Sequence, residues 1–124
     1  MRHDASERPV VLLVEDEPLV RMFSADVLEE AGFEVIEAFN GDEALNVLDA
    51  RHDIEVLFTD VNMPGSLDGL NLARVVHERR PSIKLLIASG QVRLSDDQIP
   101  DAGRFLAKPY APEAIVREVR ELIR

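Results

Sequence analysis

Five short apolar runs along this chain alternate with segments whose apolar residues recur at helical spacing. The first run, residues 10–14, reads VVLLV. A continuous, β-branched run of this kind is typical of a parallel strand buried on both faces. Further strands are expected at about 33–38, 55–59, 83–88 and 103–107. Because strands that alternate with helices form a parallel sheet covered on both sides, the pattern predicts an α/β fold.

Helix start and stop signals lie between these runs. Pro18 suits the first turn of a helix that Gly32 would end. Asn40, with a glutamate three residues later, begins a capping-box pattern, Asp68 can cap the next helix, and Pro112 opens the last one. The apolar residues that recur at helical spacing in the first helix are Leu19, Val20, Met22, Phe23, Val27, Leu28 and Ala31.

Residues 91–102 interrupt the regular pattern. They are polar, include Pro100 and show little helical periodicity, so we expect a short or distorted fourth helix there. Together the segments predict a doubly wound, five-stranded parallel sheet in the flavodoxin-like order 2-1-3-4-5, with helices on both faces.

Composition narrows the class of protein. A length of 124 residues fits one domain, expected at 9–124 after a flexible segment at 1–8. The absence of cysteine excludes thiolate nucleophiles and zinc–thiolate sites, and the three histidines lack metal-ligand spacing. Apolar stretches too short to span a bilayer, and an N-terminus unlike a signal peptide, predict a cytoplasmic protein without membrane contact. The net charge of −10 argues against direct nucleic-acid binding.

Polar residues follow four of the five predicted strands, where ligands bind in open α/β sheets. They are Glu15 and Asp16 after the first strand, Asp60 after the third, Ser89 at the end of the fourth and Lys108 after the fifth. Three converging carboxylates would repel one another, and a cation is the natural remedy. Oxygen ligands without histidine or cysteine favour Mg²⁺, to which the backbone carbonyl of Asn62 could add another oxygen.

These residue types suit phosphoryl transfer. Asp60 is the candidate nucleophile, because a carboxylate can attack phosphorus to give an acyl phosphate, while Mg²⁺ neutralises the phosphoryl oxygens. Ser89 could hydrogen-bond a phosphoryl oxygen, and Lys108 could pair with its charge, with Pro109 fixing the lysine inward, for example through a cis peptide. Taken alone, each is as easily a turn residue, a polar loop start or a solvated lysine. Their occurrence at four strand ends is much more specific.

At this point the chain resembles the response-regulator receiver domain of two-component signalling, over about residues 9–124. The motifs that carry the resemblance are VEDEP (14–18), TDVNMPG (59–65), DGL (68–70), ASG (88–90) and LAKP (106–109). The resemblance implies a phosphoacceptor signalling domain rather than an enzyme, one that assists its own phosphorylation and dephosphorylation.

The resemblance also implies a role for each matching residue. Asp16 would bind Mg²⁺ directly and Glu15 mainly through water, while Asp60 would accept a phosphoryl group from a sensor histidine kinase or a histidine phosphotransfer protein. Lys108 would bind the phosphate, and Ser89 would move toward it as Phe105 turns inward, changing protein contacts.

Two features depart from the family pattern. The loop after Asp60 is one residue longer than usual, so residues 65–67 are expected to bulge beside the site. The weak helix at 91–102 belongs to the family's output surface, which argues against conventional dimerisation through that face. We expect a monomer or a weak dimer.

Other functions fit the sequence less well. A Mg²⁺-dependent phosphohydrolase normally has an acid two residues after its aspartyl nucleophile, where this chain has Asn62. A flavin-binding module would need a phosphate loop where Glu15 and Asp16 would repel phosphate. A degenerate receiver is opposed by the complete set of site residues. Because no further segment follows the last helix, we expect a stand-alone receiver, with a phosphorelay shuttle or phosphate sink as the alternative to a switch.

Overall fold

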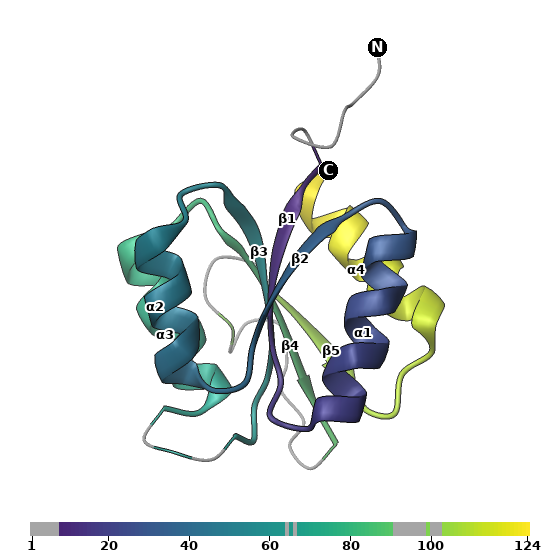
Figure 1. Cartoon of the computed structure of the whole chain (residues 1–124), viewed down its shortest axis with the longest axis horizontal. Coiled ribbons are helices and arrows are strands. Elements are labelled where there is room, and N and C mark those ends of the chain that lie inside the picture. The colour runs from purple at the N-terminus through teal and green to yellow at the C-terminus, as the bar shows by residue number, and fades with distance from the viewer. Residues whose placement is uncertain (1–7, 64, 66, 91–98, 100–102) are drawn as a thin grey trace.

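The computed structural model describes residues 8–63, 65, 67–90, 99 and 103–124. Within them, five parallel strands form one sheet in the order β2-β1-β3-β4-β5 (Figure 1). The strands are β1 (Val10–Val14), β2 (Glu34–Ala38), β3 (Ile54–Asp60), β4 (Lys84–Ser89) and β5 (Arg104–Ala107). Their bounds differ from the predicted ones by one residue at most, and the predicted flavodoxin-like order is confirmed.

Helices cover both faces of the sheet. They are α1 (Pro18–Glu30), α2 (Gly41–Ala50), α3 (Gly69–Arg79) and α4 (Pro112–Ile123). Figure 1 shows α1 and α4 on one face and α2 and α3 on the other. The helix expected at 91–102 lies outside the described residues, apart from Ile99, whose side chain is buried in the core. Among the helices that the structure describes, none is long and apolar enough to cross a membrane.

The predicted helix signals are found where the sequence placed them. The Asn40 side chain accepts a hydrogen bond from the Glu43 N–H at 2.8 Å, and the Asp68 side chain accepts one from the Asn71 N–H at 2.9 Å. The Glu43 carboxylate accepts from the Phe39 N–H rather than from that of Asn40, so the capping box is shifted by one residue. Gly32 ends α1 with φ of 101°, a conformation that favours glycine.

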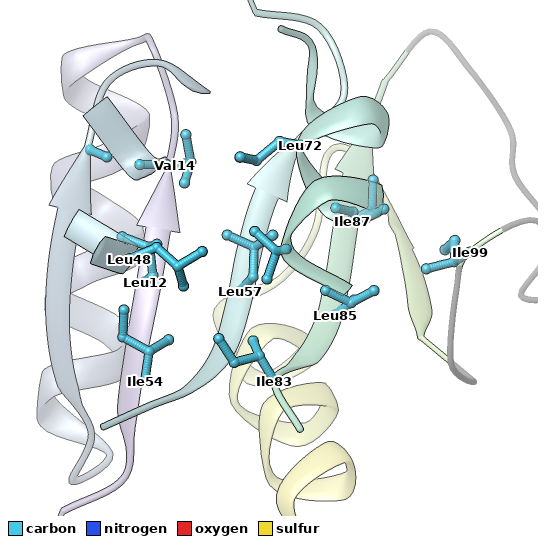
Figure 2. Close-up of a cluster of buried hydrophobic side chains, with 14 of the residues drawn as sticks. Leu12, Val14, Leu48, Ile54, Leu57, Leu72, Ile83, Leu85, Ile87 and Ile99 are labelled. Carbon is cyan, nitrogen blue, oxygen red and sulfur yellow. The ribbon is translucent and has the colours of Figure 1, made fainter. Parts of the chain in front are cut away.

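Two apolar layers, one on each face of the sheet, hold these elements together. Under α2 and α3, the layer contains Leu12, Val14, Leu48, Leu57, Leu72, Ile83, Leu85 and Ile87 (Figure 2). Under α1 and α4, it contains Val11, Leu13, Ala25, Leu28, Phe58, Leu86, Ile115 and Val119. Side chains alternate across a strand, so β3 contributes Leu57 to one layer and Phe58 to the other. The five strand ends are thus fixed between two packed layers.

The apolar pattern of α1 is only partly buried. Leu28 is buried, together with Ser24 and Ala25, but Leu19 and Met22 are 76% and 54% exposed, and Phe23 is 47% exposed. The face of α1 that contacts the sheet is centred on residues 24 and 28, and a turn of 3.6 residues places the exposed three away from it. Helical spacing alone therefore overstated the core contribution of α1.

Ion pairs tie β2 to the neighbouring elements. Glu34 pairs with Arg51, which follows α2, at 3.1 Å, and Glu37 pairs with Arg21 of α1 at 3.3 Å. Arg51 also pairs with Asp53 at 2.7 Å. Both glutamates of this strand are therefore engaged by arginines from adjacent segments.

Candidate functional site

Three carboxylates meet at the carboxyl edge of the sheet. Glu15 and Asp16 follow β1, and Asp60 is the last residue of the adjacent β3. Each offers one oxygen, and these oxygens lie within 4.8 Å of one another. Glu15 and Asp60 are only 4% and 9% exposed. The convergence expected from the strand ends is present in the fold.

Lys108 reaches the same place from the end of β5. Its Nζ lies 3.1 Å from Glu15 Oε1 and 3.4 Å from Asp60 Oδ1. Its backbone N–H donates to the Ser89 carbonyl at 3.0 Å, which continues the pairing of β4 with β5. The Lys108–Pro109 peptide is cis, as the sequence allowed. The two contacts of Nζ direct the lysine side chain inward rather than into solvent.

Burial and charge shift the pKa values of this cluster. Burial raises the pKa of Asp60, Lys108 lowers it and Asp16 raises it further, with a net increase. Burial also raises the pKa of Glu15, against the lowering effects of the Glu17 N–H and Lys108. For Lys108, burial alone would lower the pKa, but the hydrogen bond to Glu15 and the charges of Glu15 and Asp60 outweigh it and raise the pKa. One ammonium thus only partly offsets three carboxyl groups.

The donor set fits a hard divalent cation. All three side chains offer oxygen, and the described site has neither histidine nor cysteine. Mg²⁺ prefers oxygen ligands and is commonly held by one or two carboxylates together with waters and phosphate oxygens. The net negative charge of the three carboxylates favours the binding of such an ion. Lys108 engages both Glu15 and Asp60, and Glu15 also accepts from the Glu17 N–H; direct binding by Asp16 and water-mediated binding by Glu15 stay predictions.

Backbone contacts of the next residue, Val61, fix the strand end at Asp60. The Val61 N–H donates to the Ala88 carbonyl, and the Gly69 N–H donates to the Val61 carbonyl, both at 2.9 Å. A Cβ atom on Gly69 would lie 1.9 Å from the Asp60 carbonyl oxygen, so only glycine permits α3 to begin this close to the strand end. The role of Gly69 was not predicted, although the Asp-Gly pair at 68–69 was part of the recognised motif.

The remaining predicted residues occupy different surroundings. Ser89 is buried and ends β4, next to Ala88, which lies opposite Asp60 in the strand register. Phe105 of β5 is half-buried and packs against the layer under α2 and α3. Asn62 is exposed two residues beyond Asp60. The metal-binding role of its carbonyl and the switch roles of Ser89 and Phe105 stay predictions.

The described part of the long loop after Asp60 packs against the start of α2. A Cβ atom on Gly41, the first residue of α2, would lie 2.9 Å from Leu67 Cδ2 and 3.0 Å from the Leu67 carbonyl oxygen. Gly65 has φ of 99°. Residues 64 and 66 lie outside the described part, so the expected bulge beside the site is seen only through these two neighbours. Leu67 packs into the core as a partly buried side chain.

A cleft of about 620 Å³ opens beside the cluster. It lies between α1 and the segment that follows β5, and its lining includes Leu19, Phe23, Lys108, Pro109 and Tyr110. The exposed apolar side chains of α1 thus border the site. Neither this cleft nor a contact of Tyr110 was predicted from the sequence.

Comparisons with known proteins agree with the geometry. A family model described as the response regulator receiver domain matches residues 11–120. The chain is 31% identical over 116 residues to the response regulator receiver protein CpdR of Brucella abortus (strain 2308), covering 91% of this chain and 95% of that protein. It is 33% identical over 124 residues to the sensor kinase CckA of the same organism, covering 97% of this chain. It spans only 13% of that kinase's length. A crystal structure of a response regulator receiver protein from Sinorhizobium medicae WSM419 matches with a TM-score of 0.87 and 28% identity, covering 95% of this chain and 96% of that one.

Proposed function

This chain belongs to the response-regulator receiver domain family of two-component systems, and from this premise we propose that Asp60 accepts a phosphoryl group from a phosphohistidine. The donor would be a sensor histidine kinase or a histidine phosphotransfer protein, and the outcome a change in protein–protein contacts. The observation that carries the proposal is the meeting of Glu15, Asp16 and Asp60 with Lys108 at one sheet edge.

The proposed step is a displacement at phosphorus. A carboxylate oxygen of Asp60 forms a bond to phosphorus while the bond to the donor histidine nitrogen breaks, and the protonated ring leaves as neutral imidazole. Bound Mg²⁺, held by Asp16 and Asp60 with the Asn62 carbonyl, would supply positive charge to the phosphoryl oxygens. Lys108, already 3.4 Å from Asp60 Oδ1, would pair with the phosphoryl charge from the other side.

Phosphorylation would be read out through Ser89 and Phe105. Ser89 ends β4, the strand adjacent to the one that carries Asp60, and its hydroxyl would move toward a new phosphoryl group. Movement of Ser89 would change the packing of Phe105, which lies opposite Ile87 in the β4–β5 register. Such a repacking would alter the surface formed around β5 and the segment after it.

The surface around the site supports a protein as phosphodonor. Leu19, Met22 and Phe23 are exposed on α1, and two of them line the cleft beside Lys108. Exposed apolar side chains grouped at a cleft are typical of protein-binding surfaces. The donor protein would cover them while presenting its histidine to Asp60.

Incubation with acetyl phosphate, followed by intact mass spectrometry, tests the phosphoacceptor role. We expect a gain of one phosphoryl group that requires Mg²⁺ and is lost in Asp60→Asn. Asp26→Asn is the matched control, because Asp26 is an exposed aspartate on α1, and it should behave as wild type. No gain in the wild-type chain, or an equal gain in Asp60→Asn, would contradict the proposal.

A second assay separates a switch from a shuttle or phosphate sink. The phosphorylated chain is mixed with a histidine phosphotransfer domain, and the label on both proteins is followed over time. Rapid return of phosphate to the histidine would identify a shuttle. A phosphorylated state that persists and changes partner binding would identify a switch.

A further inference from the structure

The segment that carries Lys108 is anchored by one side chain that the proposed chemistry does not use. Tyr110 lies two residues after Lys108 and one after the cis Pro109. Its ring packs against Phe58, with ring centroids 6.0 Å apart and planes tilted by 52°. Phe58 lies on β3, two residues before Asp60, so the tyrosine rests directly on the strand that carries the phosphoacceptor.

The hydroxyl of Tyr110 makes a second contact, to α1. It lies 3.4 Å from Ser24 Oγ, and Ser24 is only 1% exposed. A buried hydroxyl requires a hydrogen-bond partner, and Tyr110 fills this requirement for Ser24. The contact spans 86 positions in the sequence and joins α1 to the segment between β5 and α4 (Figure 1).

On either side of Tyr110, the described contacts of this segment are the Lys108 N–H bond to the Ser89 carbonyl and the Ala114 N–H bond to the Ala111 carbonyl. Pro109 has no N–H to donate, and Ala111 caps α4 without a side-chain hydrogen bond. Burial raises the pKa of Tyr110, and the hydrogen bond to Ser24 lowers it; the charge of Lys108 lowers it further, while the charges of Glu15 and Asp60 raise it. The phenol is therefore coupled to the charged cluster without being part of it.

We propose that Tyr110 is a positioning residue for phosphorylation: its ring on Phe58 and its hydroxyl on Ser24 hold the 108–111 segment so that the Lys108 ammonium lies between Glu15 and Asp60. The proposal rests on the phosphoacceptor function of Asp60. Without the hydroxyl contact, the segment shifts from α1, and Lys108 spends less time at the two carboxylates.

Two variants test this inference, alone and together. Tyr110→Phe keeps the ring on Phe58 and removes the hydroxyl, and Ser24→Ala removes the partner. The distance of 3.4 Å is long for a hydroxyl pair, so each variant should slow phosphorylation by acetyl phosphate only about two- to fivefold. The double variant should be no slower than either single one, since both remove the same contact. Ser82→Ala, an exposed serine elsewhere, is the matched control and should leave the rate unchanged.

A direct measurement follows the lysine itself. The chain has only two lysines, Lys84 and Lys108, and Lys84 is exposed. In protein labelled with ¹³C-lysine, Tyr110→Phe and Ser24→Ala should move the Lys108 ε-methylene signals toward those of Lys84, which should stay fixed. Mg²⁺ binding should not weaken, because Lys108 is not a metal ligand, whereas general loosening of the site would weaken it.

The outcomes separate this inference from the proposed function. Unchanged Lys108 signals, rate effects that multiply in the double variant, or slowing that merely follows the unfolded fraction would overturn the positioning role while the wild type still gains phosphate. A wild type that gains no phosphate would overturn the proposed function and the rate part of this inference. The lysine signals would then still decide whether Tyr110 fixes Lys108.

Discussion

Asp60 is held where its charge is costly. It is 9% exposed, close to Asp16 and Glu15, and burial raises its pKa despite the nearby lysine. The same features that destabilise the bare carboxylate favour a cation beside it, and in the proposed function they favour its reaction with a phosphoryl group. Active sites commonly trade stability for function in this way.

Replacing the Asp60 carboxylate with a neutral amide should therefore stabilise the metal-free protein. We expect Asp60→Asn to raise the melting temperature at neutral pH by roughly 2–6 °C, because the amide removes the buried charge while Lys108 keeps Glu15 as a partner. The folded-state pKa of Asp60 lies above its unfolded value, so the folded state holds more protons between the two values. Wild-type stability then falls as pH rises through this window, and the advantage of the variant disappears below it.

Thermal unfolding followed by circular dichroism from pH 4 to 8, in EDTA, measures this difference. Asp26→Asn serves as the exposed control and should melt as wild type does. A variant that melts below wild type at neutral pH, or an advantage that grows on acidification, would contradict the electrostatic account.

Helix α3 shows how an element can set the geometry of the site from outside it. Its cap, Asp68, fixes where the helix starts, and Gly69 lets that start press against the Asp60 carbonyl. The Gly69 N–H completes the contact by bonding the Val61 carbonyl. The position of Asp60 therefore depends on a helix that contributes no charged group to the cluster.

Substitutions of Gly69 and of the cap residue Asp68 should have different effects on the rate of phosphorylation. Gly69→Ala places a Cβ against backbone, so we expect a loss of more than about 2 kcal/mol in unfolding free energy and at least a tenfold slower phosphorylation. Asp68→Ala should cost about 1 kcal/mol yet leave the rate within about twofold, since no atom is pushed toward Asp60. Urea unfolding and the acetyl phosphate assay measure both quantities. Similar rates for the two variants would show that the close approach of α3 does not position Asp60.

At the scale of the whole molecule, the order of the strands brings the residues of the site together. Because β1, β3, β4 and β5 are parallel and adjacent, residues separated by up to 93 positions, such as Glu15 and Lys108, meet at one edge. The two apolar layers fix the strands that carry them. A ligand bound at this edge should therefore stabilise the entire fold rather than one loop.

Mg²⁺ should raise the melting temperature of the wild-type chain. Binding to the folded state alone adds RT ln(1 + [L]/Kd), about 1.4 kcal/mol at a tenfold excess over Kd. Asp16→Asn and Asp60→Asn should lose most of this increase, and EDTA should reverse it. Sodium at equal ionic strength is the control for screening. An equal effect of the two cations would argue against a specific site.

The sequence predicted the parts of this molecule that follow from local pattern. The strands, the helix caps and the strand-end residues were found because apolar periodicity and the positions of proline, glycine and capping residues indicate them. Parallel packing of the strands then brings Asp60 and Lys108 together. The exposed face of α1, the contact of Leu67 with Gly41 and that of Tyr110 with Ser24 were not predicted. Each depends on which surfaces meet across long separations in the chain, and helical spacing identifies an apolar side chain without saying what covers it.

The glutamates of β2 also bear on how copies of this chain would meet. An edge strand presents unpaired N–H and C=O groups that can recruit a strand from another molecule. Here β2 is five residues long, and Glu34 and Glu37 are already engaged by Arg51 and Arg21. A second copy adding its own β2 to this edge would bring two further glutamates close to these, and like charges on paired strands are destabilising. The short, charged edge therefore protects the protein against edge-to-edge growth into aggregates.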